Sequence, residues 1–175
     1  MKILCFSDSH NNTYFMKSAL SMHKDAEIVI FLGDGLRDID DIYLDYPDKK
    51  FLAVRGNCDL KNTAFGTEIK KTDYIEIEGK RIIFTHGDLY GAKYGTAGLE
   101  KLAEQTAADV VLFGHTHIPE SIYCPKKEEP ADENYPSAEK AYYLFNPGSI
   151  GSSSPSYGII TLGYGEPLFS HGTFL

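Results

Sequence analysis

Lys-Ile-Leu-Cys-Phe-Ser, residues 2–7, runs directly into Asp8-Ser9-His10, and this junction indicates the fold class. A short apolar run that ends in polar residues is typical of a buried strand whose carboxyl end opens onto a surface. The same change occurs twice more, with 28–32 followed by Gly33-Asp34 and with 51–54 followed by Arg55-Gly56-Asn57. Helices predicted at 13–23 and 38–44 separate these strands. The resulting β-α-β-α-β order predicts an α/β fold with crossover helices.

The second half of the chain changes pattern and predicts further strands. Residues 74–78 alternate apolar and polar side chains, as a half-buried strand does, and a turn expected at Gly79-Lys80 leads into a return strand at 81–85. A helix is predicted at 96–107, and strands at 110–113, 118–123, 142–145, 157–162 and 168–172. The polar stretch 125–140 is expected to be an exposed excursion. Because there is no internal repeat and no dividing linker, residues 1–175 are expected to form a single domain, with two packed sheets and helices outside.

The composition limits the classes of function. The 175 residues carry a formal net charge of -8, which argues against general nucleic-acid binding, because such binding depends on basic side chains that neutralise phosphates. The apolar runs are too short to span a membrane and no secretory leader follows Met1, so no membrane partner is expected. The cysteines, Cys5, Cys58 and Cys124, are too few and too scattered for a disulfide framework, which fits a reducing compartment. We therefore expect a cytoplasmic protein, and the oligomeric state stays open.

Polar residues of metal-binding type follow five of the predicted strands. In open α/β sheets ligands bind beyond the carboxyl ends of the strands, so these loops are expected to converge. Each residue alone has an ordinary structural explanation, since an aspartate often caps a helix and a histidine can be a satisfied core residue. Four of the 6 histidines lie in these loops, however, and that conjunction is hard to explain without a metal. The candidate ligands are Asp8, His10, Asp34, Asn57, His86, His115 and His117.

The mixture of ligand types indicates the kind of centre. Imidazole nitrogen combined with carboxylate and amide oxygen suits Mn, Zn, Fe or Ni, and a site that needs no thiolate is not a structural zinc site. Seven ligands are too many for one ion and suit two divalent ions that share a bridge. Such a pair can clamp the attacking and leaving oxygens of an in-line displacement, with a hydroxide between the ions as the nucleophile. We expect two Mn²⁺ ions, with Ni²⁺, Zn²⁺, Fe or Mg²⁺ as alternatives.

The order Asp-x-His, Gly-Asp, Gly-Asn, His and Gly-His-Thr-His resembles the calcineurin-like metallophosphoesterase superfamily. The Gly-Asn-Cys-Asp form at 56–59 and the Asn-Pro-Gly-Ser turn at 146–149 are similar to its small bacterial and archaeal phosphodiesterase branch. The resemblance implies a four-layer α-β-β-α sandwich with two packed mixed sheets, and hydrolysis of a small phosphodiester. It implies that one ion is bound by Asp8, His10 and His117. The second ion would be bound by Asn57, His86 and His115, with Asp34 bridging the two.

Five positions in or near these motifs depart from the superfamily pattern or have open roles. Cys58 stands where much of the superfamily has a histidine that is thought to protonate the leaving group or steady the phosphate. A thiol donates hydrogen bonds weakly, so a small turn residue is favoured over a catalytic role for Cys58. Asp59 is the other catalytic candidate, and it could orient a ligand or cap a turn, while Asp88 could support a ligand or be solvated. Arg55, the only arginine beside the motifs, and Asn57 are the candidates for binding the substrate.

Three functions remain open, and a phosphodiesterase is favoured. A phosphomonoesterase that acts on a phosphorylated metabolite would use the same metal clamp, but no cluster of Lys and Arg suited to a dianionic monoester is evident. The third possibility is a protein-interaction scaffold similar to the retromer subunit of this superfamily, with weak activity or none. The scaffold is disfavoured because every proposed ligand position is filled.

Overall fold

The first sheet of the computed structural model, which describes residues 1–126 and 140–174, has a parallel half and an antiparallel half. Its strand order is β12-β11-β1-β2-β3. β1 pairs with β2 and β2 with β3 in parallel, whereas β11 pairs antiparallel with both β1 and β12. The sheet is therefore mixed. Its strands are β1 (Lys2–Phe6), β2 (Ile28–Phe31), β3 (Lys50–Ala53), β11 (Ser156–Thr161) and β12 (Leu168–Thr173).

The second sheet is also mixed and has the order β6-β7-β8-β10-β9. The three central strands β7, β8 and β10 are parallel, and each edge strand pairs antiparallel with its neighbour. The second sheet is built by β6 (Thr72–Ile77), β7 (Lys80–Thr85), β8 (Val110–Leu112), β9 (Pro119–Cys124) and β10 (Tyr142–Pro147).

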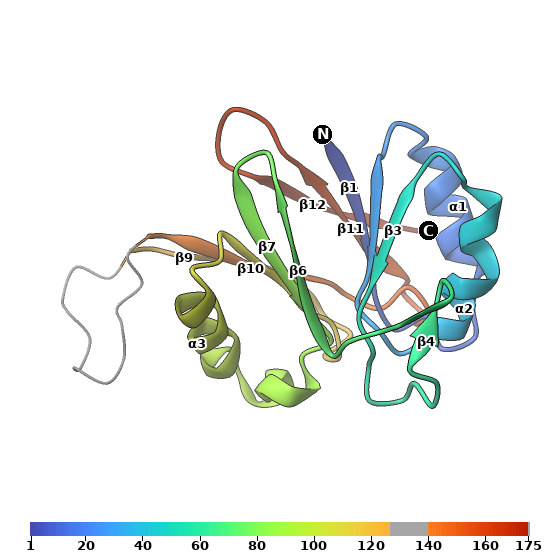
Figure 1. Cartoon of the computed structure of the whole chain (residues 1–175), viewed down its shortest axis with the longest axis horizontal. Coiled ribbons are helices and arrows are strands. Elements are labelled where there is room, and N and C mark those ends of the chain that lie inside the picture. The colour runs from blue at the N-terminus through green and yellow to red at the C-terminus, as the bar shows by residue number, and fades with distance from the viewer. Residues whose placement is uncertain (127–139, 175) are drawn as a thin grey trace.

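Helices cover the outer face of each sheet, so that four layers result (Figure 1). α1 (Tyr14–Met22) and α2 (Leu36–Ile42) lie on the first sheet, and α3 (Ala97–Thr106) lies on the second. Short helical turns occur at Tyr43–Asp45, Asp88–Tyr90 and Ala92–Tyr94, and a small hairpin is formed by β4 (Thr63–Ala64) and β5 (Thr67–Glu68). The prediction of an α-β-β-α sandwich with two packed mixed sheets is confirmed.

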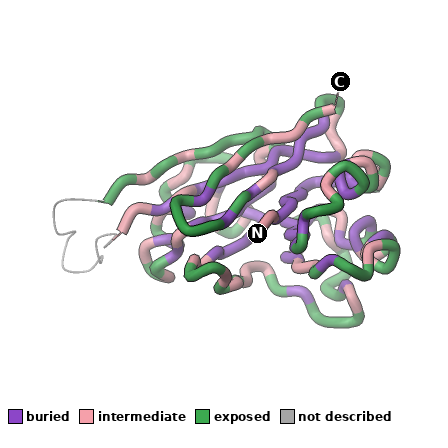
Figure 2. The backbone as a smooth tube through the Cα atoms, turned by 90° about the horizontal axis from the view of Figure 1, so that it is seen from above, coloured by how far each residue is buried: buried purple, intermediate pink, exposed green. Residues whose placement is uncertain are grey.

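The alternation of side chains along the buried strands explains the layering. In β1, Ile3 and Cys5 pack into the core between the two sheets, while Leu4 and Phe6 pack against the helices. A strand that is apolar on both faces needs cover on both, which a facing sheet and an outer helix provide. Figure 2 shows the result, with buried strands inside and exposed residues on the outer turns of the helices.

Some predicted boundaries differ from the observed ones. The helix predicted at 38–44 begins at Leu36, because Gly35 has a φ of 148° and ends the preceding loop. The hairpin turn lies at Glu78-Gly79 and not at Gly79-Lys80. Both turn residues have positive φ, at 50° and 70°, as a two-residue turn matched to the twist of the strands requires.

Two further sequence expectations concern exposed or membrane-spanning segments. The predicted excursion at 125–140 falls largely on residues 127–139, outside the described residues. Among the helices of residues 1–126 and 140–174, none has the length and apolar character needed to cross a membrane.

Candidate metal centre

The loops that carry the candidate ligands converge at one end of the sandwich. β1, β2 and β3 are parallel, and so are β7 and β8, so the carboxyl ends within each set lie at a common edge. Packing of the two sheets brings both edges together, at the lower side of Figure 1. All seven predicted ligands reach this end, and their contacts divide six of them into two groups.

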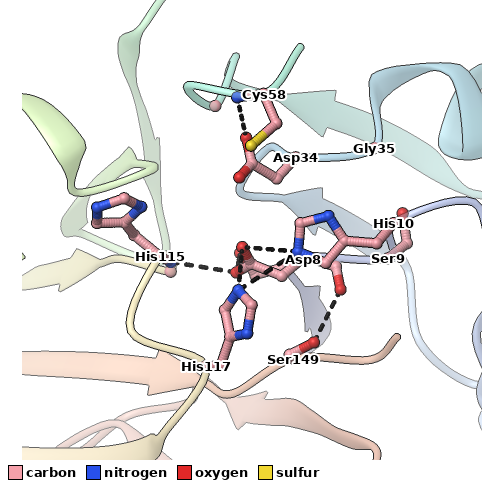
Figure 3. A network of polar contacts seen from close by, with 12 residues as sticks. Asp8, Ser9, His10, Asp34, Gly35, Cys58, His115, His117 and Ser149 are labelled. Carbon is pink, nitrogen blue, oxygen red and sulfur yellow. Dashed lines mark hydrogen bonds and ion pairs between the residues drawn. The ribbon is translucent and has the colours of Figure 1, made fainter. Parts of the chain in front are cut away.

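The first group consists of Asp8, His10 and His117. His117 Nε2 lies 3.1 Å from Asp8 Oδ1, and His10 Nε2 lies 3.3 Å from His117 Nε2. Asp8 is fully buried, while the two histidine rings are about two-fifths exposed, at 39% and 44%. Figure 3 shows both rings directed toward the Asp8 carboxylate. The group therefore presents a buried anion and two accessible imidazoles to a common point.

The second group consists of Asp34, His86 and His115, with Asn57 beside it. His86 Nε2 lies 3.3 Å from Asp34 Oδ2 and 3.1 Å from both His115 Nδ1 and Asn57 Oδ1. His86 Nδ1 donates to the Leu32 carbonyl oxygen at 2.8 Å, which leaves the Nε2 lone pair directed at the group. Asp34 Oδ1 accepts the backbone N–H of Cys58 at 2.7 Å.

Strained backbone conformations coincide with the candidate ligands. Positive φ is uncommon for residues other than glycine and is costly to maintain. In the described part of the chain, Asp8, His10, Asp34, His115 and His117 have φ values of 56°, 46°, 57°, 70° and 63°. Five of the nine non-glycine residues with positive φ in the described part of the chain are therefore candidate ligands, which is consistent with a functional site at these loops.

Burial and the neighbouring charges shift the pKa values of the second group in opposite directions. Burial raises the pKa of Asp34, but the hydrogen bond and charge of His86 outweigh it and hold this pKa well below its usual range. Burial lowers the pKa of His86, but the hydrogen bond to Asp34 and the charges of Asp8 and Asp34 raise it overall. Burial, followed by repulsion from His86, lowers the pKa of His115.

Asp59 ties together the two loops that carry Asp34 and Asn57. Its Oδ2 accepts the backbone N–H groups of Asp34 and Gly56, at 2.8 and 2.9 Å. Its Oδ1 accepts those of Gly35 and Leu36, at 2.9 and 2.8 Å. Of the two roles open from sequence, these contacts fit the positioning of a ligand loop. A catalytic role for Asp59 stays a prediction.

Two other ligand loops have comparable supports. Asp38, which the sequence did not indicate, accepts the hydroxyl of Ser9 at 2.6 Å and the backbone N–H of Asn11 at 2.8 Å. Ser149 donates its hydroxyl to the Asp8 carbonyl at 2.8 Å. Asn146 donates to the Gly114 carbonyl at 3.0 Å, which fixes the start of the loop of His115 and His117. The turn at 146–149 therefore supports two ligand loops.

The remaining predicted site residues lie near the centre but outside the two groups. Cys58 is exposed, and its Sγ accepts the side-chain amide of Asn57 at 3.1 Å. A hydrogen bond to Asp34 raises the pKa of the Cys58 thiol. Arg55 Nε is buried without a hydrogen-bond partner in the described residues. Asp88 forms an ion pair with Lys71 at 3.0 Å, so it is not merely solvated.

A pocket of about 330 Å³ opens beside the centre and contains cations that the sequence reasoning missed. His10, Asp34 and Cys58 line it, and so do Arg37 and Lys61. The expectation that Arg55 is the only arginine beside the motifs is wrong, because Arg37 shares this pocket with Asp34. Their positions in the sequence were the available signal, since Arg37 comes three residues after Asp34 and Lys61 comes four residues after Asn57.

Both side-chain groups fit divalent metal ions. In each, one ligand atom from every residue lies within 4.8 Å of the others. Neutral imidazole together with carboxylate is a usual donor set for first-row transition metals. The structure therefore has two Asp-His groups that could each bind a divalent ion.

Comparison with known proteins gives consistent results. The sequence profile of the calcineurin-like phosphoesterase superfamily domain matches residues 1–164. The chain is 28% identical over 168 residues to the probable metallophosphoesterase YsnB of Bacillus subtilis, covering 93% of this chain and 85% of YsnB. It is 27% identical over 182 residues to phosphodiesterase YfcE of Escherichia coli K12, covering 91% of this chain and 87% of YfcE.

Solved structures show the same fold at lower identity. A conserved protein of Streptococcus pneumoniae, described as a predicted phosphoesterase, superposes with a TM-score of 0.70 at 20% identity, covering 98% of this chain and 88% of that one. Vacuolar protein sorting 29 of Cryptosporidium parvum also has a TM-score of 0.70, at 15% identity, covering 99% and 97%.

Proposed function

Since the chain belongs to the calcineurin-like phosphoesterase superfamily, a family of hydrolases of phosphoric esters, we propose that it is a metal-dependent phosphodiesterase that acts on a small phosphodiester. The observation that carries the proposal is the meeting of two Asp-His groups at the strand ends, with five of their residues in strained conformations. The sequence relationship to a protein named phosphodiesterase supports the diester over the monoester.

The proposed ligands are the same seven residues that the sequence indicated. Asp8, His10 and His117 would bind one ion, and His86, His115 and Asn57 the other, with Asp34 between them. Two divalent ions, of which Mn²⁺ is the first choice, would polarise the phosphoryl oxygens and lower the pKa of water at the site. The chain itself contributes orientation. Asp59 and Asp38 accept hydrogen bonds from the loops of Asp34, Asn57 and His10. Asn146 and Ser149 donate to the backbone of Gly114 and Asp8.

A scaffold function is the second candidate, because vacuolar protein sorting 29 has the same fold. At 15% identity this likeness concerns the fold alone. The filled ligand positions and the pocket beside them favour an enzyme.

The test of this proposal is an assay of the purified protein, loaded with Mn²⁺, on bis(para-nitrophenyl) phosphate and on para-nitrophenyl phosphate. We expect kcat/KM for the diester to exceed that for the monoester by at least about tenfold, or ~1.4 kcal/mol. Metal-stripped protein should be inactive on both, because the proposed ions would polarise the phosphoryl oxygens and activate the attacking water. A faster monoester reaction would indicate a phosphomonoesterase. Absence of activity on both esters, with two ions bound per chain, would favour the scaffold.

Replacement of the thiol provides a second test. We expect Cys58→Ser to change turnover of bis(para-nitrophenyl) phosphate by less than about tenfold, whereas loss of a general acid typically costs ~10²–10⁴-fold. Sγ accepts a hydrogen bond from Asn57, and the para-nitrophenolate leaving group needs little protonation. Turnover is compared at matched metal content. Cys58→His is the companion variant. Improved hydrolysis of unactivated esters by this variant would show that a side chain at position 58 can act as a general acid. A loss well beyond tenfold in the serine variant would assign the thiol to the chemistry.

A further inference from the structure

The pocket beside the metal centre has two sides of different character. One is formed by centre residues such as His10 and Cys58, and the other by Leu36, Arg37, Leu60 and Lys61. A volume of about 330 Å³ is near the lower end of the range for small-molecule sites. It suits one ester group of a small substrate.

The apolar residues on the second side of the pocket are unusual because one of them is fully exposed. Leu36 is buried, but Leu60 has a relative exposure of 101% and belongs to none of the hydrophobic clusters formed by residues 1–126 and 140–174. A leucine held open beside a polar centre offers contact area to a ring or a short carbon chain of a ligand.

The acidic residues of the pocket are already engaged. Asp59 accepts four backbone N–H groups, and Asp38 accepts Ser9 and the N–H of Asn11. Asp34 is bound to His86 and to the N–H of Cys58. Their charges are therefore partly neutralised by donors of the chain.

The cations of the pocket, in contrast, are available. Arg37 has a side chain that is 79% exposed, and its only ion pair in the described residues, with Asp41, is 3.9 Å long. Lys61 forms no hydrogen bond or ion pair with any residue in 1–126 or 140–174. Guanidinium and ammonium groups that face the same pocket are suited to an anion such as phosphate or carboxylate.

From these contacts we propose that one of the two organic groups esterified to the substrate phosphate lies in this pocket. This ester group carries a second anionic group, phosphate or carboxylate. Leu60 contacts the carbon part of that ester group, and Arg37 and Lys61 bind the anion. The substrate class is therefore a small phosphodiester with an additional charged group, and Arg37 and Lys61 determine specificity. This inference rests on the proposed function, which it makes more specific.

The test uses three thymidine para-nitrophenyl phosphodiesters that differ only at the second sugar hydroxyl, which is free, phosphorylated or carboxymethylated. We expect wild type to prefer an anionic substrate by about five- to thirtyfold in kcat/KM, the range for one or two exposed ion pairs. In R37Q/K61Q the preference should fall to about twofold or less. Preference for both anions would define the site as a general anion site, and preference for the phosphorylated ester alone as a phosphate site.

The control is K24Q/K50Q, which removes two exposed positive charges at the opposite ends of β2 and β3. It should keep the preference. The inference is overturned if wild type shows no preference, if R37Q/K61Q retains it, or if K24Q/K50Q loses it equally. If every ester is inert, the proposed function has failed. The inference is then decided by calorimetry, in which thymidine bisphosphate should bind to wild type at least about fivefold more tightly than thymidine monophosphate, and equal affinities would refute it.

Discussion

Asp34→Asn should lower turnover of bis(para-nitrophenyl) phosphate by at least about 100-fold. Mutation of a residue that only hydrogen-bonds to a metal ligand already costs ~10–100-fold, and Asp34 is proposed to bind the ions directly. Asp34 is 4% exposed, and its two oxygens face different partners, His86 Nε2 at 3.3 Å and the Cys58 N–H at 2.7 Å. An amide can still accept the Cys58 N–H, so the loop should keep its conformation. The amide lacks the negative charge that would screen two ions from each other, so metal content should fall below two per chain.

Turnover, metal content and circular dichroism together check this prediction. The control is Asp25→Asn, which also removes one negative charge, but from a residue that is paired with Lys2 far from the centre. It should leave turnover and metal content unchanged. Near-normal turnover of Asp34→Asn with two ions bound would show that the carboxylate does not bridge them.

Asp59→Ala should destabilise the fold by about 3–5 kcal/mol, since each hydrogen bond to a charged group contributes ~1.5–3 kcal/mol and such contributions are not fully additive. The four N–H groups of Asp34, Gly35, Leu36 and Gly56 would lose a common acceptor. Thermal unfolding should shift down by roughly 6–20 °C, because each kcal/mol corresponds to ~2–4 °C in a chain of this size.

A second readout separates positioning of the ligand loops from general stability. Well below the unfolding transition, Asp59→Ala should bind Mn²⁺ at least about tenfold more weakly, because the loops of Asp34 and Asn57 are no longer tied together. Asp59→Asn, which keeps one accepting oxygen, should recover part of both losses. Asp45→Ala is the control, since Asp45 is exposed and its pair with Lys17 should contribute less than about 1 kcal/mol. Unchanged metal affinity in folded Asp59→Ala would limit Asp59 to a structural role.

Local patterns in the sequence determined most of the secondary structure. Apolar runs such as 28–32 and the alternation at 74–78 predicted strands, because burial on one or both faces leaves a periodic record in the chain. The boundaries that were wrong, at Leu36 and at Glu78-Gly79, depend on residues with positive φ. Side-chain polarity does not encode these dihedral angles, so periodicity could not locate them.

The chemistry of the seven candidate ligands was also readable from the sequence. Asp, Asn and His directly after strands are local signals, and the parallel order of those strands implied that the loops share an edge. The structure added the division of Asp8, His10 and His117 from Asp34, His86 and His115. The resemblance to the superfamily had implied two sets of ligands with Asp34 as a bridge, but composition and spacing alone could not give the division.

Only the tertiary structure decided which residues support and surround the centre. Asp59 accepts N–H groups from positions 23 to 25 residues away, and Ser149 donates to Asp8 across 141 residues. Arg37 and Lys61 share a pocket because α2 and the loop after β3 lie side by side, although 24 residues separate them in the chain. Such contacts depend on how the sheets pack and on backbone N–H directions, which are set by the whole fold. Local motifs in the sequence therefore give the types of the candidate ligands. The packing of distant loops determines how these ligands are arranged and the shape of the pocket.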